Sequence, residues 1–146
     1  MSEYKEPASV KTPWHLWLVG GLSVFWNGFG CVDYIMTATR NAAYLKPYPQ
    51  EMLDYWLNMP TWMWAAWAVG VFGGLFGSLA LLLRRKVAFP FFAASFVTSS
   101  ISMSFGFLDK NAPRMEGANI MSGIILLIAF LLALYAWWMS RRDVLR

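Results

Sequence analysis

The chain has 146 residues, of which 58% are hydrophobic, 18% are aromatic and only 14% are charged. A soluble domain usually carries about a quarter charged residues, so this composition argues against a soluble fold. The charges gather in a polar head, short connections and a basic tail, with long apolar stretches between them. This distribution predicts an integral membrane protein with the lipid bilayer as its first partner.

The net charge of +4 does not indicate a nucleic-acid partner, because the basic residues flank the apolar segments and form no stripe of their own.

Cys31 is the only cysteine, so no intrachain disulfide is expected. Thirteen mostly polar residues precede the first apolar run. That run, of about 22 residues, is too long for the apolar region of a signal peptide, so we expect it to stay in the mature protein.

Four apolar segments are long enough to cross a bilayer as α-helices, at about 22 residues each. They cover residues 14–36, 61–83, 87–108 and 118–139. Pro13 and Pro60 immediately precede the first two, as suits the first turn of a helix. We therefore expect an all-α fold, with residues 1–146 forming one domain, a bundle of four transmembrane helices.

The orientation of this bundle follows from its Lys and Arg residues. Eight of them lie in the head, the second connection and the tail, and four lie in the first and third connections. The positive-inside rule then places both termini in the cytoplasm. Tryptophans near the ends of the segments are typical of an aromatic belt. They are Trp14, Trp17, Trp62, Trp64, Trp137 and Trp138.

The connection over residues 37–59 is the only long one, and it is expected to face the exterior. Within it, residues 49–58 predict a short helix that begins at Pro49 and has an apolar side around Trp56. Such a helix can lie at the membrane surface and cap the bundle. The alternative is a packed connector with no function.

Asp33 is the clearest outlier, because an ionised carboxylate inside an apolar helix is costly and must find a partner or a proton. Asn27, two turns deeper, also needs hydrogen bonds. Arg40 follows Asp33 by seven residues, so a continuing helix would let the two form an ion pair. One interpretation is an outward-open polar pocket that binds substrate through Asn27, Asp33, Tyr34, Arg40 and Asn41. The other is that Asp33 and Arg40 pair at the interface while Asn27 holds two helices together.

Small and hydroxyl residues mark the second and third segments. The glycines of the second segment form two overlapping G-x-x-x-G patterns, which favour close helix packing within the bundle or between two copies of it. They are Gly70, Gly73, Gly74 and Gly77. The hydroxyls of the third segment either bond to their own helix or line a polar path. They are Ser95, Thr98, Ser99, Ser100, Ser102 and Ser104.

No set of residues indicates catalysis, a metal or a cofactor. His15 is the only histidine and has neither a second histidine nor a cysteine near it in sequence, so no zinc or haem site is expected. No Ser/His/Asp arrangement, phosphate-binding loop or dinucleotide fingerprint is present. An enzyme is therefore the least favoured class.

Several motifs between Trp14 and Phe96 resemble a family of small bacterial four-helix inner-membrane proteins labelled "sugar transporter". They include Trp26-Asn27-x-x-Gly30-x-x-Asp33-Tyr34, Arg40-Asn41, Ala66-Trp67-Ala68-x-Gly70-Val71 and Gly77-Ser78-Leu79. The resemblance implies a bacterial inner-membrane protein and points to the same polar residues as the physical argument. A more distant resemblance to DoxX-like proteins rests on architecture alone.

Two functional hypotheses follow. The first is a small-solute transporter or solute-binding protein, in which Asp33 contacts the solute or carries a proton, Arg40 is its charge partner and Asn27 is the deeper contact. Four helices rarely enclose a transport path, so this hypothesis predicts a homo-oligomer. The second is an accessory subunit of a larger membrane complex, which would dock through the glycine face and the short loop helix.

Overall fold

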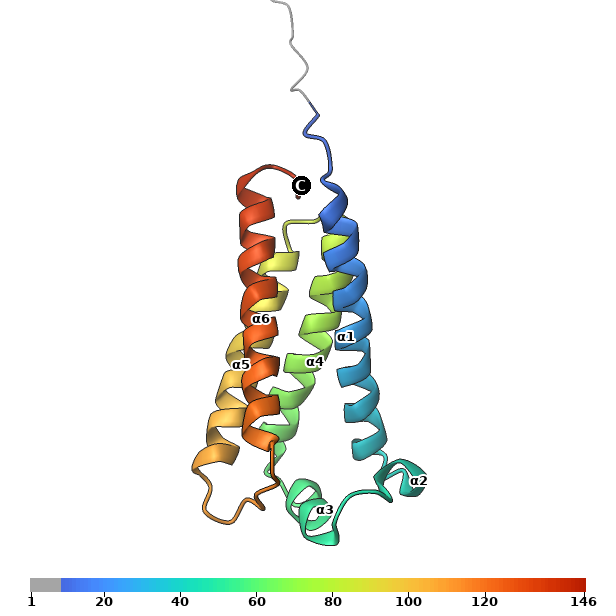
Figure 1. Ribbon diagram of the computed structural model, residues 1–146, viewed down its shortest axis with the longest axis vertical. Coiled ribbons are helices and arrows are strands. Elements are labelled where there is room, and N and C mark those ends of the chain that lie inside the picture. Colours follow the sequence, from blue (N-terminus) through green and yellow to red (C-terminus); the bar gives the residue numbers. More distant parts are fainter. Residues whose placement is uncertain (1–8) are drawn as a thin grey trace, which may run out of the picture.

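The computed structural model of the chain describes residues 9–146, and this part of the chain is all-helical, without strands. Its helices are α1 (Trp14–Ala38), α2 (Ala42–Leu45), α3 (Gln50–Leu57), α4 (Thr61–Leu82), α5 (Ala88–Leu108) and α6 (Ala118–Arg141). The four long helices run side by side, and the short helices α2 and α3 lie at one end of them (Figure 1). We call this the α2–α3 end. The opposite end, where α1 begins and α6 ends, is called the terminal end.

The four long helices end within two residues of their predicted limits. The loop helix predicted over residues 49–58 is present as α3. Pro13, Pro49 and Pro60 each occupy the position directly before a helix, where a missing N–H costs nothing. The single turn α2 was not predicted. The Asn41 side chain caps it by accepting a 3.0 Å hydrogen bond from the Tyr44 backbone N–H.

Three of the long helices, α4, α5 and α6, are long and apolar enough to cross a membrane. The prediction of four such spans is therefore confirmed only in part. α1 has 25 residues, so length is not what separates it from the others. His15, Asn27 and Asp33 all lie within it and lower its mean hydropathy.

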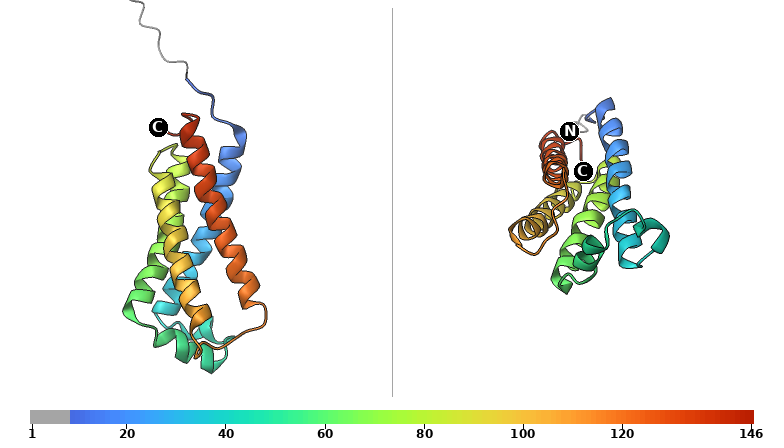
Figure 2. Two further views of the ribbon diagram at one scale, coloured as in Figure 1. Left: turned by 90° about the vertical axis from the view of Figure 1, so that its left-hand side faces the viewer. Right: turned by 60° about the horizontal axis from the view of Figure 1, so that its bottom comes forward.

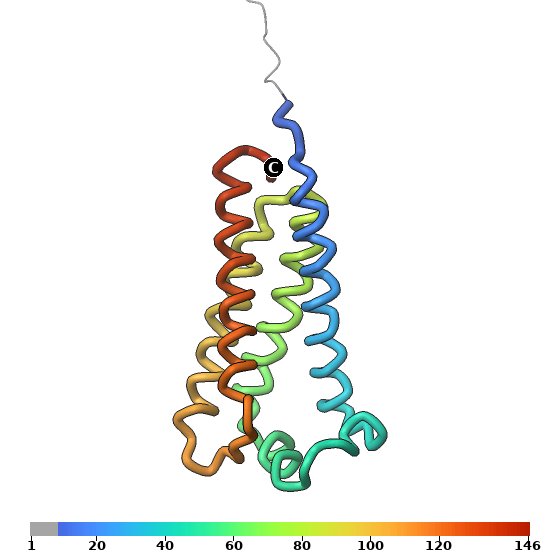
Figure 3. The backbone as a smooth tube through the Cα atoms, in the orientation of Figure 1, coloured from blue at the N-terminus to red at the C-terminus, as the bar shows by residue number. Residues whose placement is uncertain are grey.

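The long helices pack in chain order, with α1 on α4, α4 on α5 and α5 on α6. α1 and α6 share no extended interface. In Figure 3, α1 (blue) and α6 (red) run along opposite sides of the view with α4 (green) between them. Figure 2 shows the same helices from two further directions. The bundle is thus an open row of four helices whose two outer members do not close against each other over most of their length.

The packed core lies toward the terminal end. Its members come from all four long helices and from the segment after α6: Leu16, Ala80, Leu81, Ala88, Phe92, Leu132, Ala133, Ala136, Met139, Val144 and Leu145. That last segment folds back on the α4–α5 connection. The Lys86 backbone N–H donates to Arg146 O over 2.9 Å, and the Arg146 N–H donates to Arg84 O over 2.7 Å. The C-terminus therefore closes this end of the bundle.

The glycines of α4 lie where the neighbouring helices come closest. Gly70, Gly73 and Gly77 face α5, and Gly74 faces α1. A Cβ atom added at Gly77 would lie 2.9 Å from the Phe92 ring, and one added at Gly74 would lie 2.7 Å from Asn27 Cγ. Both distances are too short for real Cβ contacts, so the absence of a side chain is what lets these helices approach. The glycine face is occupied within the chain.

Candidate functional site

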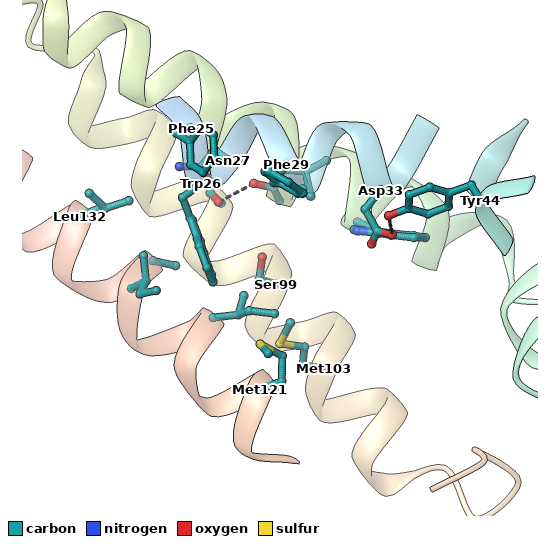
Figure 4. Close-up of a pocket in the computed structure, with 18 of the residues that line it drawn as sticks. Phe25, Trp26, Asn27, Phe29, Asp33, Tyr44, Ser99, Met103, Met121 and Leu132 are labelled. Atoms are coloured by element: carbon teal, nitrogen blue, oxygen red, sulfur yellow. Dashed lines mark hydrogen bonds between the residues drawn. The ribbon is translucent and has the colours of Figure 1, made fainter. Parts of the chain in front are cut away.

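A cavity of about 580 Å³ lies among α1, α4, α5 and α6 (Figure 4). Clefts of about 300–1,000 Å³ are typical of small-molecule sites. The α6 wall is entirely apolar and consists of Met121, Ile125, Ile128, Ala129 and Leu132. The α1 wall carries three aromatic rings, Phe25, Trp26 and Phe29. Figure 4 shows Trp26 extending from α1 toward the side chains of α6.

The polar side chains of the cavity come from α1, α5 and the segment containing α2. They are Asn27 and Asp33, Ser95 and Ser99, and Tyr44 and Tyr48. Asn27 and Asp33 are six residues apart, which places them about 9 Å apart along the axis of α1. The cavity therefore has polar groups near its middle and at its α2–α3 end, within walls that are otherwise mostly apolar.

Asn27 joins α1 to α4. Its Nδ2 donates to Ser23 O over 2.9 Å and to Ser78 Oγ over 3.2 Å. The Ser78 hydroxyl donates in turn to Gly74 O over 2.7 Å. The Asn27 side-chain oxygen accepts no hydrogen bond from any residue of the described part of the chain, so one acceptor of this amide is free.

Asp33 is bound by a tyrosine. The Tyr44 hydroxyl donates to Asp33 Oδ1 over 2.8 Å, which holds α2 against α1. This hydrogen bond to the carboxylate, together with partial burial, raises the pKa of Tyr44 to about 12. The second carboxylate oxygen, Oδ2, accepts no hydrogen bond from residues 9–146.

The predicted ion pair between Asp33 and Arg40 is wrong. It assumed that the helix continues to Arg40, but α1 ends at Ala38 and Arg40 adopts a left-handed conformation with φ 54°. The Arg40 side chain is exposed as a result. Among residues 9–146, Lys86 and Asp143 make the one ion pair within 4 Å, at 3.6 Å between two exposed side chains.

The other residues predicted for the pocket do not line the cavity. Tyr34 packs edge-on against three aromatic rings at centroid distances of 5.7, 5.1 and 5.8 Å: Trp64, Trp67 and Phe72. Asn41 is used as the cap of α2. The structure therefore brings Asn27 and Asp33 to the cavity and leaves Tyr34, Arg40 and Asn41 outside its lining.

The hydroxyl side chains of α5 include both predicted roles: some bond to carbonyls of their own helix, and others line the cavity. Thr98 and Ser100 donate to carbonyls one turn back on their own helix. Ser95 crosses to α4, where its hydroxyl donates to Gly70 O over 2.5 Å. The Ser99 hydroxyl lines the cavity and makes no hydrogen bond with the residues that the structure describes.

At the terminal end, one polar contact joins α1 to α6. His15 Nδ1 and the Tyr135 hydroxyl share a hydrogen bond of 2.5 Å. The His15 ring also stacks on Trp138, with 10° between the planes and 6.3 Å between the centroids. Together with the packed core, this contact closes the bundle beyond the cavity.

A second cavity, of about 600 Å³, lies at the α2–α3 end, where α3 faces the ends of α5 and α6. The Tyr55 hydroxyl donates to Asp109 Oδ2 over 3.0 Å and attaches α3 to the end of α5. Burial and this hydrogen bond raise the pKa of Tyr55. The polar side chains of this cavity are Tyr55, Ser104, Arg114, Asn119 and Ser122, and Arg114 is the one charged side chain among them.

Within residues 9–146, no three His, Cys, Asp or Glu side chains are grouped so that they could hold a metal ion. No protein-family model matches the sequence, and no curated protein or solved structure is significantly similar to the chain. The resemblance drawn from the sequence motifs therefore stays a prediction, and the function has to be argued from the first cavity.

Proposed function

We propose that the chain is a four-span membrane protein that binds a small molecule in the cavity among α1, α4, α5 and α6. It would act as a solute-binding protein or transporter. The observation that carries the proposal is the cavity itself, which has a volume of about 580 Å³ and has Asn27, Asp33 and Ser99 in its mostly apolar lining. Polar groups placed inside membrane helices are costly, and they usually mark a site of function.

The exposed face of α1 supports its role as the fourth span. The side chains along this face are all apolar and between 46% and 74% exposed: Trp14, Leu18, Leu22, Phe25, Phe29 and Val32. Asn27 lies on the other side of the helix, and Asp33 lies at the edge of this face, about 40° around the helix from Phe29. Both side chains are half-buried and belong to the cavity lining. A helix with this arrangement can present only apolar surface to lipid although its mean hydropathy is lowered.

We further propose that the terminal end faces the cytoplasm. Basic residues of the α4–α5 connection and of the C-terminal tail lie at this end, as the positive-inside rule requires: Arg84, Arg85, Lys86, Arg141, Arg142 and Arg146. The bacterial inner membrane is the location implied by the resemblance in the first two-thirds of the sequence.

In this proposal Asn27 and Asp33 contact the bound molecule, while Tyr44 holds the α2 segment over the α2–α3 end of the cavity. A transport path would need a second copy of the chain, because four helices with one open side do not enclose a channel. A binding protein needs no second copy. The alternative role as an accessory subunit loses one of its expected docking surfaces, since α5 and α1 occupy the glycine face of α4.

The test is purification from the native membrane in a mild detergent, followed by native mass spectrometry. We would compare the wild type with Ala129→Trp, which fills the cavity, and with Leu127→Trp, whose position is 57% exposed and outside the cavity. We expect a bound small molecule in the wild type and in Leu127→Trp, and its loss in Ala129→Trp. Equal occupancy in all three proteins, or stoichiometric co-purification with other proteins and no small molecule, would overturn the proposal.

A further inference from the structure

We propose that the cavity binds a lipid-soluble molecule with a hydrogen-bond-donating head, and that this molecule enters sideways from the bilayer between α1 and α6. This inference rests on the proposed function, because it needs both helices to cross the membrane. It adds the class of ligand and the route by which the ligand arrives.

The open side of the cavity lies between α1 and α6, which share no extended interface. Four side chains line the cavity and are also exposed: Phe25 at 69%, Trp26 at 38% and Phe29 at 64% on α1, and Met121 at 53% on α6. They therefore form the rim of its mouth. Because this rim lies on the sides of two proposed spans, the mouth opens toward hydrocarbon and not toward water.

The routes along the bundle axis are covered by protein. At the terminal end, the His15–Tyr135 hydrogen bond and the packed core close α1 against α6. At the α2–α3 end, Tyr44 and Tyr48 belong to the cavity lining, and Tyr44 is tied to Asp33. The side between α1 and α6, which share no extended interface, is not covered by these contacts.

The size of the cavity fits a small molecule. Its volume of about 580 Å³ lies within the range of about 300–1,000 Å³ that is typical of small-molecule sites.

The chemistry of the walls suggests which molecule fits. The α6 wall is apolar throughout and suits a hydrocarbon body. Asp33 Oδ2 and the Asn27 side-chain oxygen accept no hydrogen bond from residues 9–146, and both atoms can only accept, whereas the free hydroxyls of Ser99 and Tyr48 can donate or accept. A carboxylate can only accept, so a head with a hydroxyl or amino group is the complementary one. The head would lie toward the α2–α3 end, beside Asp33.

Spin-label accessibility tests the route. A nitroxide would be attached to Ser99→Cys, and separately to Ala129→Cys, in a Cys31→Ala background reconstituted in phosphatidylcholine–phosphatidylglycerol vesicles. Val97→Cys is the control, because Val97 is 52% exposed and outside the cavity lining. We expect lipid-soluble O₂ to relax all three labels more effectively than water-soluble nickel-EDDA.

The failures of the two proposals are distinguishable in this experiment. Greater access for nickel-EDDA at the cavity labels would overturn sideways entry and leave a water-filled binding cavity, as the proposed function allows. Access for neither reagent at both cavity positions, with normal access at the control, would overturn the proposed function as well.

The head is tested by adding 1-dodecanol, or dodecane as the matched molecule without a hydroxyl, to the same vesicles. We expect 1-dodecanol to immobilise the label at Ala129→Cys in a saturable way, with no saturable effect at Val97→Cys. Asp33→Leu should weaken this saturation about tenfold, as expected for one lost hydrogen bond to a charged group. Equal effects of dodecane and 1-dodecanol, or no effect of Asp33→Leu, would overturn the proposed head group.

Discussion

The hydroxyl of Tyr44 donates a 2.8 Å hydrogen bond to Oδ1 of Asp33, and this bond ties a single turn of helix to the last turns of α1. The carboxylate that stands out in the sequence therefore has a tyrosine as its partner and not an arginine. The bond also fixes the α2–α3 end of the cavity, because both side chains belong to its lining.

Tyr44→Phe removes this hydrogen bond and leaves the ring in place. We expect it to lower the free energy of unfolding by about 1 kcal/mol, since the donor is partly exposed and solvent screens the interaction. Thermal or denaturant unfolding in detergent micelles gives this quantity. Tyr48→Phe is the matched control, and its effect should be smaller because the structure gives the Tyr48 hydroxyl no hydrogen-bond partner among residues 9–146. Equal losses in the two variants would contradict the assignment.

The contribution of Tyr44 should depend on pH in one direction. Its pKa is raised from an ordinary value of 10.0 to about 12, mainly by the hydrogen bond to Asp33. A group with a raised pKa stabilises the fold fully below its unfolded pKa and loses that effect as pH rises through the folded one. The difference in unfolding free energy between wild type and Tyr44→Phe should be constant up to about pH 10 and shrink toward pH 12. A difference that grows over this interval would contradict the bond.

Gly74→Ala places a methyl group 2.7 Å from Asn27 Cγ. We expect it to displace the Asn27 side chain from its place against α4 and to destabilise the protein by about 1–3 kcal/mol, as overpacked cores are. Gly28→Ala on α1 is the matched control, because a Cβ there meets nothing within 4 Å. The unfolding midpoints of the two variants are compared in the same detergent, and equal midpoints would show that the Asn27 side chain is not packed against Gly74.

His15 and Tyr135 are expected to be energetically coupled across the terminal end. A double-mutant cycle with His15→Phe and Tyr135→Phe should give a coupling of about 0.5–1.5 kcal/mol, the usual value of one hydrogen bond. A parallel cycle that pairs Trp14→Phe with Tyr135→Phe should give a coupling near zero, because the Trp14 side chain is 74% exposed. Additive losses in the first cycle would mean that α1 and α6 do not meet there.

The sequence allowed the long helices to be predicted well and their lateral contacts poorly. Apolar runs of span length, bounded by prolines and charges, fixed the helix limits to within two residues. The partner of Asp33 was predicted wrongly because the helix was assumed to pass Ala38, whereas the left-handed Arg40 turns the chain toward α2. A single turn such as α2 is too short to show a helical period.

The cavity was only partly predictable for a similar reason. Asn27 and Asp33 stood out because polar residues are rare within apolar segments. The α6 wall did not, because a helix that is apolar on every side carries no pattern to distinguish a cavity face from a lipid face. Ala129 and Leu127 are both apolar and differ only in how exposed their side chains are, so the structure was needed to show which of them faces the cavity.

The position of α1 decides whether the cavity lies inside the bilayer, so the most direct measurement is the side of the membrane reached by each connection. Alkaline phosphatase, which is active only outside the cytoplasm, would be fused after Lys46, after Lys86 and after Arg146 in a bacterial host. We expect activity after Lys46 and none after Lys86 or Arg146, because α1 and α4 then cross in opposite directions. An inactive fusion after Lys46 together with an active one after Lys86 would show that α1 does not cross, and would contradict a four-span protein with a ligand cavity in the membrane.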